Sequence, residues 1–263
     1  MNVFIYDHTF EGLLCAVFEA FRLKLRPDRL LTAGEPLPLL AENLLTVVTD
    51  ETSAARVWDA LQKKVSGLAI KQVAYAWLAE DGPSAELVFH YLGKIFSGVS
   101  ETDFTDPDVL ALRQLALKVD HERERVLQFV RFQKTADNIY FAGVSPFYNV
   151  VPLTVRFFAD RFADQRWIIY DLDRGYGFHY DLNAVREIDF FRPVNPDTGQ
   201  LNEAELAEDE AMFQEAWRKY FKAVNIAERA NPRLQRQFMP KRFWPYLTEM
   251  RPVAAVEGSG GER

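Results

Sequence analysis

The period of the hydrophobic pattern changes near Arg123, and this change limits the possible folds more than any other feature. Before it, apolar residues recur at three- and four-residue spacing, which is typical of amphipathic helices. After it, residues 126–132 (VLQFVRF) and 138–144 (NIYFAGV) are β-branched and aromatic and flank a polar turn, so they predict an antiparallel hairpin. A second hairpin is predicted over residues 167–180, around the turn Asp173-Arg174-Gly175.

Residues 1–120 are predicted to be mainly helical. Residues 10–25 carry a broad apolar face, with Asp7 or Thr9 as a cap before it and Pro27 after it. The short apolar runs 2–6 and 46–50 indicate strands. Further helices are predicted at residues 52–66, 72–78, 84–97 and 107–119.

The fold class that follows is α+β. Residues 121–192 are predicted to form a central antiparallel sheet of two hairpins, covered by a helix that starts near Pro152. Residues 200–250 are predicted to be helical and are rich in aromatic and basic side chains. We predict that residues 1–250 form a single compact unit and that residues 251–263, rich in Gly and Ala, form a disordered tail.

Composition excludes several classes of protein. Cys15 is the only cysteine, which excludes an internal disulfide, a cysteine-ligated iron–sulfur cluster and a CxxC zinc site. No phosphate-binding loop, GxGxxG, HExxH or GxSxG motif is present, so we predict no cofactor and no metal and leave the catalytic residues unknown. The chain has no apolar run of about 18 residues and no signal-peptide pattern at its start, and we expect a cytoplasmic protein.

A local reversal of charge marks the C-terminal part. The chain has a net charge of −7, yet residues 217–247 contain eight Lys or Arg and one acid. Cations neutralise phosphates and aromatic rings stack on unpaired bases, a combination typical of single-strand recognition. Trp217, Tyr220 and Phe221 lie on an apolar helical stripe and are predicted to be core. The candidate nucleic-acid-binding residues are Arg229, Arg233, Arg236, Lys241, Arg242, Phe243 and Trp244, with Arg174 presented by the hairpin turn.

Other groups allow weaker interpretations. Asp171, Asp173 and Asp181 could supply carboxylates for magnesium, although carboxylates beside a turn are more often solvated. In the enzyme hypothesis, Asp171, Asp173 and Asp189 are the candidate magnesium or acid–base groups. Arg125 and Arg131 are predicted on the same face of a strand, where at least one of them needs an acidic or phosphate partner, and a buried or edge ion pair is the simpler interpretation. Asp7, His8 and Glu11 cluster at the start of a helix, for which a solvated helix terminus is the simpler interpretation.

Three stretches resemble a bacterial family labelled as DNA-metabolism and DNA-repair proteins: FIYDHTFEGLLCAVFEAF, RFADQRWIIYDLDRGYGFHYD and ANPRLQRQFMPKRFWPYLTEM. The likeness runs from Asn2 to Met250. It implies a gene beside one for a radical-SAM protein that modifies or repairs DNA and, in some relatives, a fused uracil-DNA glycosylase-like domain. This chain has neither the CxxxCxxC motif of that partner nor a glycosylase domain. His8 stands where the family pattern YDGTFEG has glycine.

The leading hypothesis is an accessory protein of DNA repair or modification that binds damaged or single-stranded DNA and acts with a radical-SAM enzyme. The first alternative is an enzyme on nucleic acid that uses the carboxylates near residues 171–189. The second is a module that docks its basic surface on a partner protein without contacting DNA.

Overall fold

The computed structural model describes residues 1–39, 41–189 and 194–251. Contacts divide the chain into two compact units. The N-terminal unit comprises Met1–Glu122 with Phe147–Asn149, and the C-terminal unit comprises Arg123–Pro146 with Val150–Arg263. The sequence predicts one unit over residues 1–250, and whether the two parts unfold together stays a prediction. Apart from Arg251, the predicted tail lies outside the described residues.

A three-stranded parallel sheet lies in the N-terminal unit, among its described residues, in the order β2-β1-β3. The strands are β1 (Asn2–Tyr6), β2 (Arg29–Thr32) and β3 (Asn43–Thr46). The prediction of a mainly helical part found β1 but missed β2, and it placed the third strand a few residues too late. β2 has only four residues, so it is too short to show a clear alternation of apolar and polar side chains.

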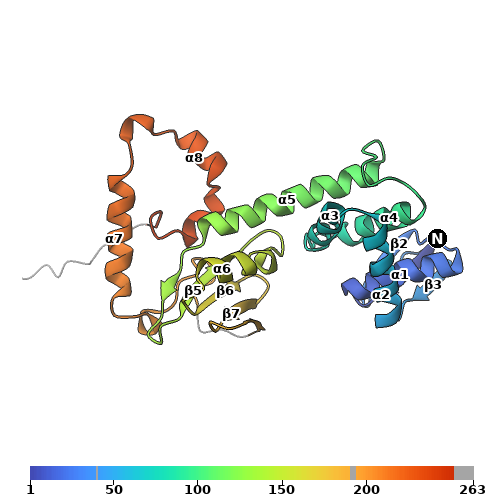
Figure 1. The fold of residues 1–263 in the computed structure, drawn as a ribbon, viewed down its shortest axis with the longest axis horizontal. Coiled ribbons are helices and arrows are strands. Elements are labelled where there is room, and N and C mark those ends of the chain that lie inside the picture. The colour runs from blue at the N-terminus through green and yellow to red at the C-terminus, as the bar shows by residue number, and fades with distance from the viewer. Residues whose placement is uncertain (40, 190–193, 252–263) are drawn as a thin grey trace, which may run out of the picture. The chain divides into compact units, whose positions relative to one another are not determined.

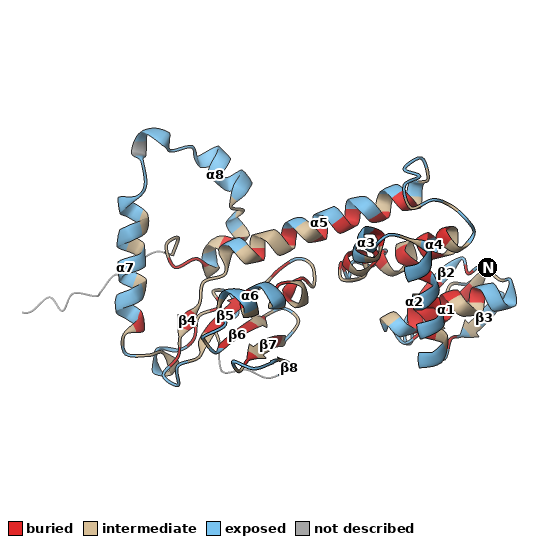
Figure 2. Cartoon of the chain, viewed as in Figure 1, coloured by how far each residue is buried: buried red, intermediate tan, exposed pale blue. Residues whose placement is uncertain are grey.

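The helices of this unit follow the predicted pattern, except that α3 begins at Gly67 and not at residue 72. They are α1 (Phe10–Leu23), α2 (Glu51–Lys64), α3 (Gly67–Trp77) and α4 (Ser84–Phe96), and most of their apolar stripes are buried (Figure 2). The side chains of Thr9, Asp50 and Ser66 each accept a hydrogen bond from a free backbone N–H at the start of α1, α2 and α3.

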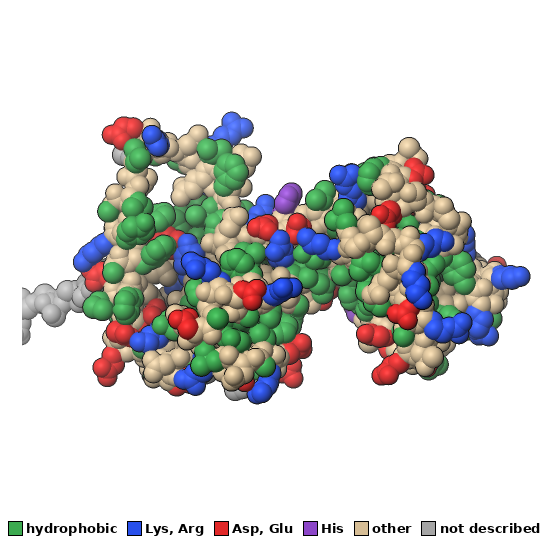
Figure 3. Space-filling view, in the orientation of Figure 1, with side chains coloured by type: hydrophobic (Ala, Val, Ile, Leu, Met, Phe, Trp, Pro, Cys, Tyr) green, Lys and Arg blue, Asp and Glu red, His purple; other side chains and the backbone are tan. Residues whose placement is uncertain are grey.

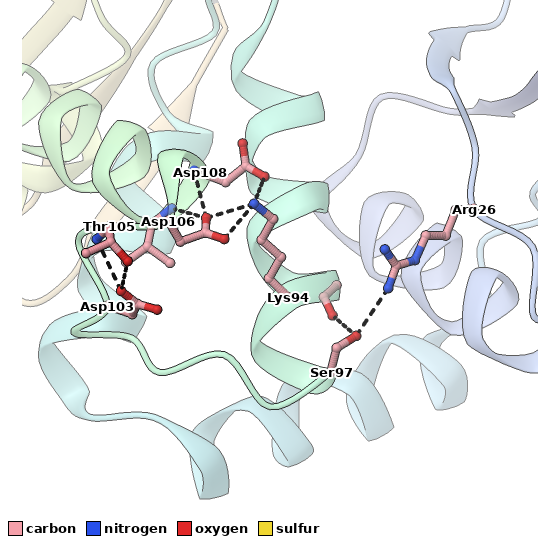
Figure 4. A network of polar contacts seen from close by, with 9 residues as sticks. Arg26, Lys94, Ser97, Asp103, Thr105, Asp106 and Asp108 are labelled. Atoms are coloured by element: carbon pink, nitrogen blue, oxygen red, sulfur yellow. Dashed lines mark hydrogen bonds and ion pairs between the residues drawn. The ribbon is translucent and has the colours of Figure 1, made fainter.

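A charged network fixes the start of α5 (Pro107–Phe129) against α4 (Figure 4). The Lys94 ammonium lies 2.8 Å from a carboxylate oxygen of Asp106 and 2.7 Å from one of Asp108. Asp106 also accepts hydrogen bonds from the backbone N–H groups of Asp108 and Val109, so it caps the helix. The hydrogen bond from Lys94 outweighs burial and lowers the pKa of Asp106, which keeps this cap ionised.

α5 corrects the prediction of a strand over residues 126–132. The helix continues to Phe129, and Leu112, Val119 and Val126 are buried at a constant spacing along one of its faces. The β-branched and aromatic composition of this stretch predicts a strand locally, but packing along the helix overrides that preference.

The C-terminal unit contains, among its described residues, a five-stranded sheet in the order β4-β5-β6-β7-β8. Its strands are β4 (Gln133–Lys134), β5 (Tyr140–Val144), β6 (Trp167–Asp171), β7 (Tyr176–Tyr180) and β8 (Val185–Ile188). Figure 1 labels β5, β6 and β7, and Figure 2 labels all five strands. The predicted β6–β7 hairpin is confirmed, and Gly175 adopts the positive φ, 73°, that its turn requires.

The α+β class is confirmed, but the sheet is not wholly antiparallel, because β5 and β6 pair in parallel. A parallel pair needs a crossover connection, and here it contains η1 (Val151–Leu153) and α6 (Val155–Arg161). Phe158 of α6 is buried against Trp167 of β6, as expected for the predicted covering helix.

Helical elements follow the sheet, as predicted: η2 (Glu203–Glu205), α7 (Glu210–Ala223), η3 (Ala227–Arg229), α8 (Pro232–Phe238) and η4 (Lys241–Tyr246). Most residues of α7 and α8 are exposed (Figure 2). No helix in the described part of the chain is both long and apolar enough to cross a membrane.

His8 occupies a backbone conformation that glycine favours, with φ at 62°. We therefore expect His8→Gly to be more stable than His8→Ala by about 1 kcal/mol, since alanine bears the strain of the left-handed region and glycine does not. Urea unfolding of the two variants measures this difference. Equal stabilities would show that the backbone relaxes at this position.

Candidate nucleic-acid interface

The apolar stripe of α7 is exposed, which corrects the prediction that Trp217 and Tyr220 are core residues. Phe213 is 55% exposed, Trp217 38% and Tyr220 58%, while Phe221 is half-buried. Figure 3 shows hydrophobic side chains along α7. A helical period identifies an apolar face, but it does not say whether anything covers that face.

Trp217 is held in place by a charged pair beneath it. Its indole N–H donates to Glu249 at 2.8 Å, and the Arg131 guanidinium binds the same carboxylate at 2.7 Å. The guanidinium also lies 5.5 Å from the centre of a Trp217 ring. Glu249 is thus the acidic partner of Arg131, which is one of the two arginines among which at least one was predicted to need such a partner.

The Glu249 side chain is only 1% exposed. Burial alone would raise the pKa of its carboxyl, but the hydrogen bonds from Arg131 and Trp217 outweigh burial and the pKa is lowered. The carboxylate therefore stays ionised at neutral pH and fixes the edge of the indole, which leaves part of the ring surface exposed.

A groove of about 710 Å³ runs beside the stripe, within the C-terminal unit. Phe213 and Trp217 of α7 line it together with Phe132 and Tyr140. The amide side chains of Gln128 and Gln214 also line the groove. A lining of aromatic rings and amides suits a flat, polar-edged group such as a nucleobase.

Four of the predicted basic residues remain available to an anionic partner. Arg229, Arg233, Arg236 and Lys241 are exposed, and none forms an ion pair with any residue that the structure describes. The Arg236 guanidinium donates to the backbone oxygen of Pro232, and the Lys241 ammonium lies 5.9 Å from a Trp244 ring.

Other predicted site residues serve the fold. Phe243 is 5% exposed and packs 5.3 Å from Phe129, so it is a core residue and not a stacking surface. Trp244 is half-buried and donates to the backbone oxygen of Met239, and the Arg242 guanidinium lies 4.4 Å from the Phe243 ring.

Arg174 does not point outward from its turn, as the sequence analysis expected. It binds the carboxylate of Asp171 at 3.0 Å and the backbone oxygen of Pro146 at 3.1 Å. Asp171 is fully buried and accepts two further hydrogen bonds, from the backbone N–H groups of Asp173 and Arg174. A buried carboxylate needs such a counter-charge, which explains the inward position of the arginine.

The carboxylates near the hairpin do not assemble a metal site. Burial raises the pKa of Asp171 above its ordinary value, and the charge and hydrogen bonds of Arg174 only partly offset this. In the described part of the chain, no three His, Cys, Asp or Glu side chains are grouped so as to hold a metal ion. The Asp171 carboxylate is instead held by the Arg174 guanidinium and by the backbone N–H groups of Asp173 and Arg174.

Comparison with known proteins gives one family. The model of DUF4130, described as a domain of unknown function, matches residues 83–249, which is more than half of the chain. No curated protein matches the sequence at the significance required. One solved structure, a pGpG-specific phosphodiesterase named PggH from Vibrio cholerae, aligns over 85% of this chain and 99% of its own at 12% identity, with a TM-score of 0.33. A similarity at this TM-score supports no conclusion about fold or activity.

Proposed function

We propose that this chain, which belongs to the DUF4130 family, binds single-stranded or damaged DNA through residues 210–246. One observation carries the proposal: exposed aromatic side chains on α7 and unpaired cations on and beside α8 belong to one continuous segment. Phosphates of a flexible strand would bind Arg229, Arg233 and Arg236, and unpaired bases would stack on Phe213, Trp217 or Tyr220.

Single strands suit this surface better than an undamaged duplex. Stacking needs bases whose faces are free, and the groove beside α7 offers aromatic walls for such a base. The net charge of −7 also disfavours electrostatic binding of duplex DNA over a large surface of the protein. The resemblance to DNA-repair proteins adds a partner to the proposal: a radical-SAM enzyme that acts on the strand held by this protein.

A second function is favoured by the same exposed stripe. Met212, Val224, Ile226, Leu234 and Phe238 are also exposed, and clustered apolar side chains of this kind mark protein interfaces. In this alternative the segment docks on a partner protein without DNA. The enzyme hypothesis is weaker, since the buried Asp171 is already bound by Arg174.

Binding of a labelled oligonucleotide, followed by fluorescence anisotropy across a salt titration, tests the proposal. We expect Arg233→Glu/Arg236→Glu to weaken binding at least tenfold and to reduce the salt slope by about 1.4, since each lost phosphate contact on a single strand removes about 0.7. Tyr220→Ala is expected to weaken binding roughly fivefold or more through lost stacking. Arg156→Glu on α6, a 95% exposed cation outside the segment, is the matched control.

The oligonucleotides are single-stranded, duplex and uracil-containing, at equal length. Absence of binding at low salt, or equal losses in the double variant and the Arg156→Glu control, would contradict the proposal. A complex with the radical-SAM protein that survives nuclease treatment, combined with no DNA binding, would favour the docking alternative.

A further inference from the structure

A second cavity, of about 460 Å³, lies wholly within the N-terminal unit and has no part in the proposed DNA surface. Tyr6 and Thr32, the last residues of the parallel strands β1 and β2, both line it. β1 is the central strand of its sheet, between β2 and β3. Ligands of parallel α/β sheets bind outside the carboxyl ends of the strands, where the chain turns to opposite sides of a central strand.

Tyr6 lines this cavity and carries a buried hydroxyl without a hydrogen-bond partner among the described residues. The residue as a whole is 3% exposed. Leaving a buried hydroxyl unpaired costs about 1–3 kcal/mol, so a ligand that forms a hydrogen bond with it recovers this free energy on binding. Burial and the carboxylates of Glu35, Asp7 and Glu86 raise the pKa of Tyr6 to about 12, which keeps the phenol neutral and able to accept an N–H.

The charged residues that line the cavity determine which sign of ligand charge it favours. Its lining has more acids than bases: Glu11, Glu35, Glu80, Asp81 and Glu86 against Arg29 and His8. Arg29 is bound by Glu86 at 2.8 Å, and Glu11 and Glu86 lie in the first turns of α1 and α4, where acids balance the helix dipoles.

Glu35 and Asp81 are exposed and remain as a negative excess. A hydrogen bond with Thr32 lowers the pKa of Glu35, so its carboxylate is ionised at neutral pH. Phosphates and other anions are therefore disfavoured in this cavity, and a cation is favoured.

Aromatic rings supply the rest of the wall. The ring of Trp77 lies 5.4 Å from that of Phe10 and 6.0 Å from that of His8, and His8 lies 6.0 Å from Tyr6. Aromatic faces beside carboxylates attract ammonium groups and also cover the methylene chain that carries them.

We propose that this cavity binds a linear alkylammonium ligand of the diamine or polyamine class. One ammonium donates to the Tyr6 hydroxyl and to Glu35, and the carbon chain lies against Trp77 and Phe10. A primary ammonium fits better than a quaternary one, because the unpaired hydroxyl needs an N–H donor. The site is independent of the proposed DNA binding, since it shares no residue with residues 210–246.

Isothermal titration calorimetry of the full chain tests the inference with spermidine and 1,6-diaminohexane. Both amines are expected to bind saturably, while 1,6-hexanediol, the neutral counterpart, and Mg²⁺ at matched ionic strength are not. Tyr6→Phe and Glu35→Gln are each expected to weaken amine binding about tenfold, as expected for a lost hydrogen bond to a charged group. Asp59→Asn, which removes an exposed acid of α2 outside the cavity, is expected to bind as the original protein does.

A thermal unfolding scan separates binding from folding. Without ligand, Tyr6→Phe is expected to be as stable as the original protein or more so, because it removes an unpaired buried hydroxyl. Equal heats for the amines and Mg²⁺, unchanged affinity in both cavity variants, or no binding at all would overturn the inference. Arg233→Glu/Arg236→Glu is expected to bind amines normally, so failure of the DNA proposal leaves this result unaffected.

Discussion

Gly12→Ala is expected to destabilise the N-terminal unit by about 3 kcal/mol, since a methyl group has no room at this position. A Cβ atom on Gly12 would lie 2.1 Å from Oδ1 of Asp7, 2.9 Å from Oγ1 of Thr49 and 3.0 Å from Oγ1 of Thr9. The same Asp7 carboxylate accepts hydrogen bonds from the Thr9 and Thr49 hydroxyls, at 2.6 and 2.7 Å. The new methyl group therefore breaks the cap of α1 and the tie between the loops after β1 and β3.

The matched control is Gly93→Ala in α4. A Cβ atom on Gly93 meets nothing within 4 Å, so alanine there is expected to stabilise the helix by up to about 1 kcal/mol. Urea unfolding followed by circular dichroism compares the two variants. A Gly12→Ala protein as stable as the original would mean that Asp7 and its partners move aside at little cost.

The close packing at Gly12 gives a physical reason for the TFEG pattern, which the sequence alone does not. Local signals predicted α1 with Asp7 or Thr9 as its cap, and the β6–β7 hairpin, because a cap and a tight turn depend only on neighbouring residues. Gly12 and Thr49 are far apart in the sequence, yet a Cβ atom on Gly12 would lie 2.9 Å from Oγ1 of Thr49. No local sequence pattern contains this contact.

Two errors of the sequence analysis have the same origin. Residues 126–129 of the strand predicted over residues 126–132 form the end of α5, where Val126 is buried on the same face as Val119. The stripe of α7 was predicted to be core, yet Tyr220 is 58% exposed. In both cases the apolar residues were identified correctly. Whether they are buried depends on parts of the chain that are distant in sequence.

For the candidate interface, the sequence predicted the charge reversal but not the arrangement of individual side chains. Arg229, Arg233 and Arg236 are exposed as predicted, whereas Phe243 is buried and Arg174 is bound to Asp171. Glu249 was missed altogether. The signal that points to it is the requirement of Arg131 for an acid, but the two residues lie too far apart in sequence to be paired by spacing.

Glu249→Gln is expected to destabilise the C-terminal unit by about 2–3 kcal/mol. The substitution keeps the shape of the side chain but removes the charge that Arg131 and the Trp217 indole both bind. Removing one partner of a buried ion pair leaves the other charge uncompensated, which costs far more than losing an exposed pair. Glu215→Gln on α7 is the control, because Glu215 binds only the exposed Lys219, and its effect is expected to be much smaller.

The destabilisation caused by Glu249→Gln is expected to depend on pH in a defined direction. The pKa of Glu249 is lower in the folded protein than its ordinary value of 4.5, so the folded state favours the ionised form. The stabilisation is complete above the ordinary pKa and is lost as the pH falls through the folded value. The difference in unfolding free energy between the original protein and Glu249→Gln should therefore be constant near neutral pH and shrink in acid. If the difference in unfolding free energy stays constant into acid, the glutamine acts by disturbing packing. In that case the charge of Glu249 does not hold Trp217 in the position in which part of its ring is exposed on α7.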